Sequence, residues 1–265
     1  MRLICLTEET TETLYALGAE DYIVGISGFT VRPTIARKTK PKISTYLDAN
    51  IQGILALNPD IVLAWSDLQA PICAELIKAG IEVYCFNHRT IRGILSMIEK
   101  LGRLVNKQEQ SLVFIDHINQ HLASISSKAS LRTIQPLVYF EEWFDPLITG
   151  ISWVSEIIEL CGGVDIFKEN RAFPDAKRRI LASTDKVLDK MPDIMIASWC
   201  GKGFKKEKVL ARPGWKNIPA IKYDEIYHIK SSIILQPGPA ALIDGATIIH
   251  GIIDNWQKKN QMGIK

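Results

Sequence analysis

The stretch ILALNPDIVLAW, residues 54–65, is matched later in the chain by VLDKMPDIMIASW, residues 187–199. Both begin at a helix end, pass through Pro-Asp, continue as a short apolar strand and finish on a tryptophan. A second pair, ETLYALGAEDYIVG at 12–25 and EIIELCGGVDIFKE at 156–169, shares a helix closed by glycine, an acid and a return strand. The two pairs occur in the same order, about 130 to 145 residues apart, which predicts two lobes built on one plan.

Short apolar runs rich in β-branched residues alternate with helical patterns along the chain. These runs are RLICL, YIVGI, DIVLAW, IEVYCF, PLVYF, DIMIASW and EIYHI. The alternation predicts an α/β protein with a parallel sheet in each of two Rossmann-like lobes. We predict an N-terminal lobe over residues 1–105, a linking backbone helix over 106–130 and a C-terminal lobe over 131–265.

The linking helix is predicted from NKQEQSLVFIDHINQHLASISSKAS, which contains neither Gly nor Pro. Its apolar residues follow a 3-4-3 spacing: Ile115, Ile118, Leu122 and Ile125. One continuous helix over about 107 to 129 is therefore expected to join the lobes.

Two α/β lobes are expected to leave a cleft between the carboxyl ends of their strands, which is where such sheets bind ligands. Each repeat ends a strand on a tryptophan, and we expect both side chains to point into that cleft rather than into the core. The stretch EEWFDPLITGISWVSEIIELCGG, residues 141–163, adds Trp143, Phe144 and Trp153 around a loop that enters a helix. Because aromatic side chains gain most from leaving water, this cluster indicates either a ligand surface or a loop packed on its own core.

The composition is that of a globular protein of 265 residues, 47% hydrophobic and 23% charged. A net charge of +3 with scattered basic residues argues against nucleic-acid binding, and KGFKKEK at 202–208 is interpreted as a solvated loop. Five cysteines without a C-x-x-C motif predict five free thiols. No window predicts a membrane-spanning helix, so membrane insertion is not expected. The opening MRLICLTEET predicts a first strand rather than a signal peptide, hence a cytoplasmic protein, or a periplasmic or cell-surface one if a leader has been removed.

Five stretches spread over nearly the whole chain carry a family resemblance. They are LYALGAEDYIVGIS, STYLDANIQGILALNPDIVLAW, DPLITGISWVSEIIELCGGVDIF, ARPGWKNIPAIKYDEIYHI and QPGPAALIDGATII. In order and spacing, the sequence resembles the cobalamin-binding members of the substrate-binding proteins of ABC importers, in the class whose lobes are joined by a backbone helix. Siderophore and haem binders share that fold.

The resemblance implies that a corrinoid ligand is held in the cleft by aromatic side chains of both lobes, without an intrinsic cofactor. Strand-end position and resemblance together give these candidate ligand-binding residues: Trp65, Trp143, Phe144, Trp153, Arg32, Trp199, Ser232 and Gln236. Arg32 stands where relatives have a tyrosine, and Ser232 and Gln236 stand where they have an acidic and a basic residue. Relatives dock on their permease through one surface acid per lobe, for which Asp185 and Glu75, one turn after Pro71, are the candidates.

The sequence therefore predicts a monomeric solute-binding protein that delivers a corrinoid to an ABC-type importer. The alternative is a cytosolic corrinoid, haem or siderophore binding or sensing module without a transport partner. An enzyme is not expected, because no Gly-rich phosphate loop, G-x-S-x-G or D-x-H-x-x-G motif occurs. His117 and His121 stand four apart without a third ligand nearby, so no metal site is predicted. Trp215 and Trp256 are expected to pack in the interior.

Overall fold

The computed structural model describes residues 1–263 and confirms the α/β class. The chain divides into two compact units. Unit 1 comprises residues 1–88, 92–118 and 236–239, and unit 2 comprises the remaining described residues. The predicted long helix is α6 (Gln108–Ala129), which continues without interruption from unit 1 into unit 2. All five cysteines are free thiols, as predicted.

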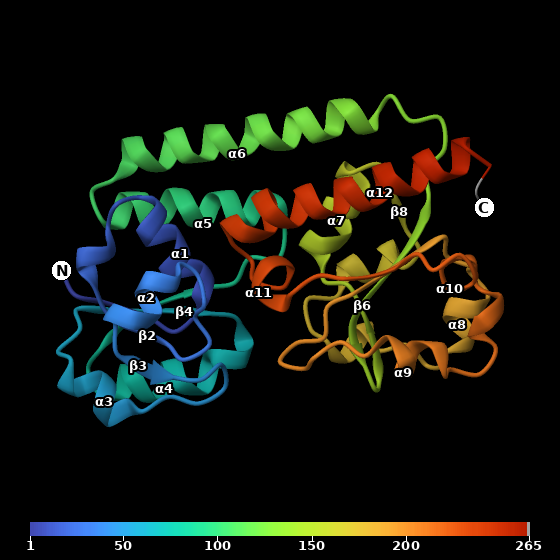
Figure 1. The fold of residues 1–265 in the computed structure, drawn as a ribbon. Helices are drawn as coiled ribbons and strands as arrows, with labels where there is room; N and C mark the ends of the chain where they lie inside the picture. The colour runs from blue at the N-terminus through green and yellow to red at the C-terminus, as the bar shows by residue number, and fades with distance from the viewer. Residues whose placement is uncertain (264–265) are drawn as a thin grey trace. The chain divides into compact units, whose positions relative to one another are not determined.

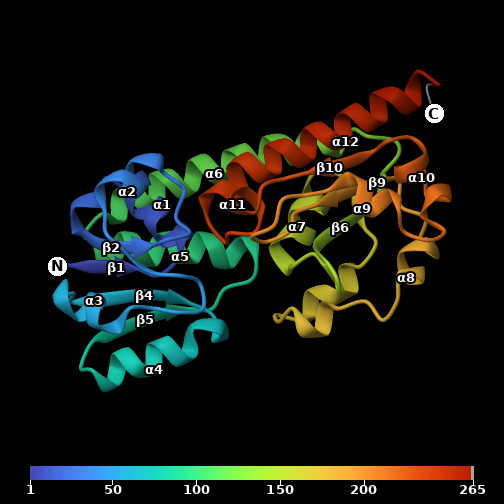
Figure 2. The same cartoon turned by 60° about the horizontal axis from the view of Figure 1, so that its bottom comes forward.

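Unit 1 contains a five-stranded sheet in which every neighbouring pair is parallel. In hydrogen-bonding order its strands are β3 (Lys42–Ser44), β2 (Ile23–Ser27), β1 (Leu3–Cys5), β4 (Ile61–Trp65) and β5 (Glu82–Phe86). Its helices are α1 (Glu8–Ala16), η1 (Glu20–Tyr22), α2 (Thr34–Thr39), α3 (Ile51–Ala56), η2 (Asp67–Gln69), α4 (Ala70–Lys78) and α5 (Ile91–Leu104). Helices α3 and α4 cover one face of the sheet, while α1 and α5 cover the other (Figures 1 and 2).

Unit 2 contains a second sheet, ordered β10 (Ile226–His228), β9 (Ile194–Ala197), β6 (Leu137–Phe144) and β7 (Leu147–Thr149), with β8 (Val164–Asp165) also paired to β6. These pairs are parallel except β6 with β7, which form an antiparallel hairpin. Its helices are α7 (Ser152–Leu160), η3 (Lys168–Ala172), η4 (Lys177–Arg179), α8 (Asp185–Leu188), α9 (Lys206–Leu210), η5 (Trp215–Asn217), α10 (Pro219–Lys222), α11 (Ser231–Ile234), the π-helical η6 (Ala241–Gly245) and α12 (Ala246–Gln261).

Left-handed residues end the corresponding helices of the two repeats. Gly18 ends α1 with a φ of 64° and Gly162 ends α7 with a φ of 84°. Glycine adopts this conformation without steric cost, which is why both helices close on it. Asn58 after α3 and Met191 after α8 are also left-handed, with φ of 51° and 45°, and each directly precedes the proline of its repeat.

The aspartate of each Pro-Asp pair fixes the start of the neighbouring strand. In unit 1 the Asp60 carboxylate accepts the Arg2 N–H at 2.6 Å, and the Asp60 N–H donates to the Arg2 carbonyl at 2.8 Å. In unit 2 Asp193 makes the same two bonds with Leu137, at 2.9 and 2.8 Å. The sequence repeat is therefore a repeated hydrogen-bonding device that positions β1 against β4 and β6 against β9.

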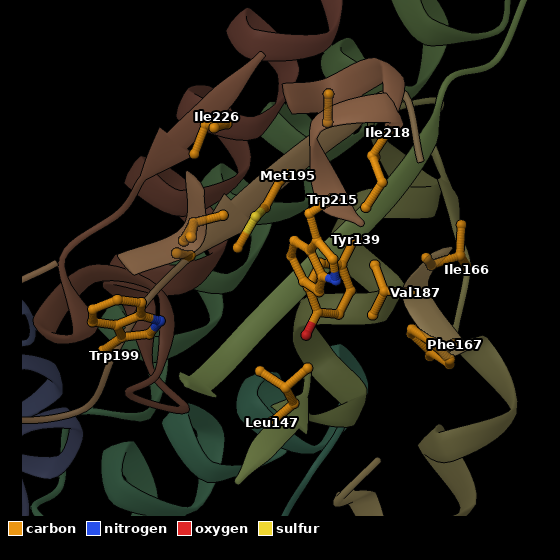
Figure 3. Close-up of a cluster of buried hydrophobic side chains, with 13 residues drawn as sticks. Tyr139, Leu147, Ile166, Phe167, Val187, Met195, Trp199, Trp215, Ile218 and Ile226 are labelled. Atoms are coloured by element: carbon orange, nitrogen blue, oxygen red, sulfur yellow. The ribbon is translucent and has the colours of Figure 1, made fainter. Parts of the chain in front are cut away.

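The apolar interior of unit 2 combines aromatic and aliphatic side chains (Figure 3). Its buried residues are Tyr139, Leu147, Ile166, Phe167, Val187, Met195, Ala197, Trp199, Val209, Trp215, Ile218, Ala220 and Ile226. Trp215 lies in the middle of this cluster, with its ring centroid 6.0 Å from that of Tyr139. Both Trp215 and Trp256 are buried, which confirms that they pack in the interior.

Candidate functional site

The topology of unit 1 places a ligand crevice at the carboxyl ends of β1 and β4. From β1 the chain winds to one side through β2 and β3, whereas β4 and β5 lie on the other side. In open α/β sheets, ligands bind where this winding reverses, outside the carboxyl ends of the strands. The residues at that point are Thr7 after β1 and Trp65 and Ser66 at the end of β4.

Trp65 reaches this position as predicted, but its ring is more buried than expected. The side chain is 5% exposed, and the indole N–H donates to the His88 carbonyl at 3.2 Å. Its ring centroid lies 6.5 Å from that of Tyr46 and 6.3 Å from that of His88. The expectation that the ring stands clear of the interior is therefore wrong, because neighbouring loops pack around it.

Gln69 connects three of the loops that surround Trp65. The side chain is fully buried, and its Oε1 accepts the Trp65 N–H at 3.0 Å. Its Nε2 donates to the carbonyls of Leu6 and Tyr46, which follow β1 and β3, at 3.3 and 3.1 Å. One amide side chain thus fixes the ends of three strands relative to one another, which makes Gln69 a positioning residue for the crevice.

Ser66 carries backbone strain beside Trp65. Its φ of 69° and ψ of 169° lie in a region that residues other than glycine rarely adopt. The strained turn is held by the Ser66 N–H, which donates to the Phe86 carbonyl at 2.7 Å. Such conformations cost about 1 to 3 kcal/mol and cluster at ligand sites. The strain therefore agrees with a functional role for this end of β4.

Exposed apolar side chains follow three strands at the same edge of the sheet. Phe29 after β2, Leu47 after β3 and Leu68 after β4 are 57%, 67% and 53% exposed. Exposed apolar residues gathered at one edge are typical of a surface that a ligand covers. Sequence reasoning missed all three, since an isolated apolar residue in a loop carries no periodic signal.

Two buried acids begin α1 directly after β1. Burial raises the pKa of Glu8 to about 8, with a further contribution from the nearby Glu12 carboxylate. Burial also raises the pKa of Glu9 to about 7, although the Thr7 hydroxyl donates to its carboxylate at 2.6 Å. Glu8 is therefore largely protonated at pH 7, so this part of the crevice carries less negative charge than its sequence indicates.

The carboxyl edge of the unit 2 sheet carries a continuous row of rings, which we call the aromatic ladder. Its members, in spatial order, are Trp143, Phe144, Trp199, Phe204 and His228. Successive ring centroids are 5.2, 4.5, 5.0 and 5.4 Å apart, and the last two rings are stacked with an interplanar angle of 5°. The ladder runs from the end of β6 past β9 to the end of β10. Three of the predicted residues, Trp143, Phe144 and Trp199, lie together in this row, next to Phe204 and His228.

A buried ion pair contacts Trp199, the central ring of the ladder. Glu141 on β6 is fully buried, accepts the Trp199 indole N–H at 2.9 Å and is paired with Arg212 at 2.6 Å. Trp143 and Phe144 are half-buried on the β6–β7 hairpin, where the sequence predicted a loop. Trp199, which Figure 3 shows at the edge of the drawn cluster, is only 3% exposed, so it supports the neighbouring rings more than it forms an open wall.

Trp153 does not belong to this surface. It lies in the first turn of α7, is 1% exposed and donates its indole N–H to the Ile234 carbonyl at 2.8 Å. The prediction that Trp153 contributes to a ligand-contacting loop is contradicted by this burial. The ring faces the interior because α7 turns its apolar stripe, which includes Ile157, toward the sheet.

The remaining candidates occupy separate places within the two units. Arg32 donates its Nε to Glu12 at 2.9 Å, and both line a hollow of about 500 Å³ between α1 and α2. Ser232 is half-buried on α11 in unit 2, and Gln236 is half-buried in the part of the chain that belongs to unit 1. Asp185 begins α8 and Glu75 lies on α4, and both side chains are exposed.

Of the two histidines of α6, His121 has hydrogen-bonding partners near the chain's last helix. The His121 Nε2 lies 3.2 Å from the Ile243 carbonyl oxygen and 3.0 Å from the Thr247 hydroxyl. Within residues 1–263, no group of three or more His, Cys, Asp and Glu side chains is placed to hold a metal ion. None of the described helices combines the length and apolar character that a membrane span requires.

Comparison with known proteins gives one consistent result. Residues 3–233 match the family described as periplasmic binding protein. The vitamin B12-binding protein of Vibrio campbellii is 28% identical over 242 residues, which are 89% of this chain and 83% of that protein. The crystal structure of the periplasmic vitamin B12 binding protein BtuF of Vibrio cholerae superimposes with a TM-score of 0.76 at 25% identity, covering 97% and 98% of the two chains. Staphylococcus aureus IsdE complexed with heme shares the fold, with a TM-score of 0.80 at 21% identity over 95% and 98% of the chains.

Proposed function

Because this chain belongs to the periplasmic binding protein family, we propose that it holds a corrinoid ligand for an ABC-type importer. It is a binding protein and not an enzyme. The relatives named as vitamin B12-binding proteins support the ligand class. The single observation that carries the proposal is the aromatic ladder of unit 2.

The chemistry of a corrinoid fits the surfaces of both units. A corrin is a large, partly apolar disc with a fringe of amide groups, so it gains from contact with ring faces and apolar side chains. The ladder offers half-buried rings at Trp143, Phe144 and Phe204. Unit 1 offers the exposed side chains of Phe29, Leu47 and Leu68 beside Trp65. The proposal therefore assigns a ligand-facing surface to the carboxyl edge of each sheet.

The transport role assigns the exposed acids Asp185 and Glu75 to contacts with a membrane permease. Asp185 lies on α8 of unit 2 and Glu75 on α4 of unit 1, and neither helix carries a ladder residue. The proposal places the protein on the outer side of the cytoplasmic membrane, as the names of its relatives do for them. The role is tested by co-purification with a permease and its ATPase, which we expect to succeed for the wild type and to fail for an Asp185→Ala, Glu75→Ala double variant.

The ligand proposal is tested on the ladder itself. Phe204→Ala removes a half-buried ring between Trp199 and His228, and we expect cyanocobalamin affinity to fall about tenfold because ring contact area is lost. Phe173→Ala is the matched control, since Phe173 is also half-buried in unit 2 with a cation, Arg178, 5.2 Å from its ring centroid, but lies outside the ladder. Affinity is measured by quenching of tryptophan fluorescence. If both variants bind with the affinity of the wild type, the ladder is not part of the ligand site.

The alternative, a binding or sensing module without a transport partner, makes a different prediction. Such a protein binds the same ligand but does not associate with a permease. Ligand binding in the absence of any permease or ATPase partner, in pull-downs from the source cells, would favour that alternative.

A further inference from the structure

The segment that builds the middle of the aromatic ladder also carries a group of lysines. Lys208 on α9 holds its Nζ 4.4 Å from the centroid of the Phe144 ring. Lys202 donates its backbone N–H to the Trp199 carbonyl at 3.3 Å, so it lies in the turn directly after that ring. Lys205 follows Phe204 and occupies the N-cap position of α9.

The ion pairs around this segment leave these three lysines uncompensated. Neighbouring cations have acidic partners: Lys206 pairs with Asp224, Arg212 with Glu141 and Arg179 with Glu142. In the described part of the chain, Lys202, Lys205 and Lys208 form no ion pair. The exposed acids Glu207 and Asp145 lie near the ladder residues in sequence, but neither forms an ion pair with any of the three lysines. The Lys208 ammonium lies beside the half-buried Phe144 ring, and Lys202 and Lys205 are exposed on the same short segment, so the three charges create a local positive field.

The far end of the ladder has the same sign of charge. Lys230 follows His228 by two residues, and desolvation together with the Lys230 charge lowers the pKa of the His228 imidazole below its ordinary value. The imidazole is therefore an uncharged ring at pH 7, and the positive charge at this end comes from Lys230.

Building on the proposed corrinoid function, we propose that this surface selects ligands with negative groups at their rim, and that Lys202, Lys205 and Lys208 are the selecting residues. A carboxylate or phosphate placed beside the rings meets ammonium groups that have no competing acidic partner. Charge-assisted hydrogen bonds to such groups are the stronger ones, and partial exclusion of water by a bound disc reduces their screening. The preferred ligand class is thus a corrinoid or tetrapyrrole that carries free carboxylates or a phosphodiester, rather than one without any negative group at its rim.

The test compares two corrinoids that differ mainly in charge. Dicyanocobinamide has amidated side chains and no phosphodiester, whereas dicyanocobyrinic acid carries free carboxylates. We expect the wild-type protein to bind the carboxylate form more tightly, with an affinity that falls as salt rises from about 0.02 to about 0.5 M, where charges are screened within a few ångströms. A Lys202→Gln, Lys205→Gln, Lys208→Gln variant should lose about tenfold in affinity for the carboxylate form, since each exposed pair contributes at most about fivefold. Its affinity for dicyanocobinamide should change little.

The matched control is Lys206→Gln, which removes a lysine of the same segment that already pairs with Asp224. It should leave the preference for the carboxylate form unchanged. If both corrinoids bind equally well and without salt dependence, or if the triple variant weakens both equally, the charge selection is wrong while corrinoid binding stands. If neither corrinoid binds to the wild-type protein, the proposed function itself fails.

Discussion

The place of Trp65 at a strand end could be predicted from the sequence, but the side chains packed around its ring could not. The repeat placed it at the carboxyl end of β4, where the structure has it. The packing of Tyr46, His88 and Gln69 around it depends on loops after other strands, so no local pattern could reveal it. The same holds for the exposed Phe29, Leu47 and Leu68. By contrast, the burial of Trp153 was predictable, because it stands four residues before Ile157 on the apolar stripe of α7.

Trp65→Ala is expected to weaken both binding and stability. Loss of the ring from the crevice should cost about 1 to 3 kcal/mol of binding free energy, which is about ten- to a hundredfold in affinity. Because the ring is buried, the variant should also lose a few kcal/mol of unfolding free energy. Titration calorimetry below the melting temperature separates the two effects.

Trp256→Ala is the control, since that ring is buried in α12. It should lose stability but bind the corrinoid with the affinity of the wild type. If instead both variants lose stability while both bind normally, Trp65 has no role in the site.

The raised pKa of Glu8 predicts that the stability of the folded protein falls as pH rises. Its folded-state pKa of about 8 lies above the ordinary value of 4.5, so between these values the folded protein keeps a proton that the unfolded chain has released. Folding is therefore opposed progressively as pH rises through this window, and Glu9, with a pKa of about 7, acts in the same direction. The melting temperature of the wild type should fall between about pH 5 and about pH 8, and that of Glu8→Gln should fall less. An identical slope for Glu8→Gln and for the exposed-site control Glu109→Gln would contradict this assignment.

At the scale of elements, the β6–β7 hairpin was the principal surprise. The acids Glu141 and Glu142 interrupt the apolar pattern of β6, which is why the stretch was predicted as a loop. Their partners are distant in sequence: Arg212 pairs with Glu141 and Arg179 with Glu142, both at 2.6 Å. Because these ion pairs form only in the folded chain, a short stretch of sequence cannot show that the two acids are neutralised. The seven strands with clear apolar runs were predicted, and β8 lies in the return strand expected after α7, whereas the short β3 and β7 were missed.

The hydrogen bonds made by Asp60 and Asp193 should contribute equally to the free energy of unfolding. Asp60→Ala and Asp193→Ala each remove one carboxylate hydrogen bond to a strand N–H, and each should cost about 1 kcal/mol of unfolding free energy. Urea denaturation measures this loss, with Asp189→Ala, an exposed aspartate at the end of α8, as the control. A loss in only one of the two variants would mean that the sequence repeat has no common structural role.

At the scale of the whole molecule, the repeat and the uninterrupted helix α6 were sufficient to predict the fold class. The ligand is less determined by sequence, because the same fold carries proteins named for vitamin B12 and for haem. What favours a corrinoid is the combination of the aromatic ladder in unit 2, the apolar edge of unit 1 and the B12-binding relatives.

The most direct test is isothermal titration of the wild-type protein with cyanocobalamin, cobinamide, haem and a ferric hydroxamate siderophore in parallel. We expect at least one corrinoid to bind at one molecule per chain with a Kd of about 1 μM or tighter, and the siderophore to bind far more weakly. Tight binding of haem or of the siderophore, with no heat from either corrinoid, would contradict the account.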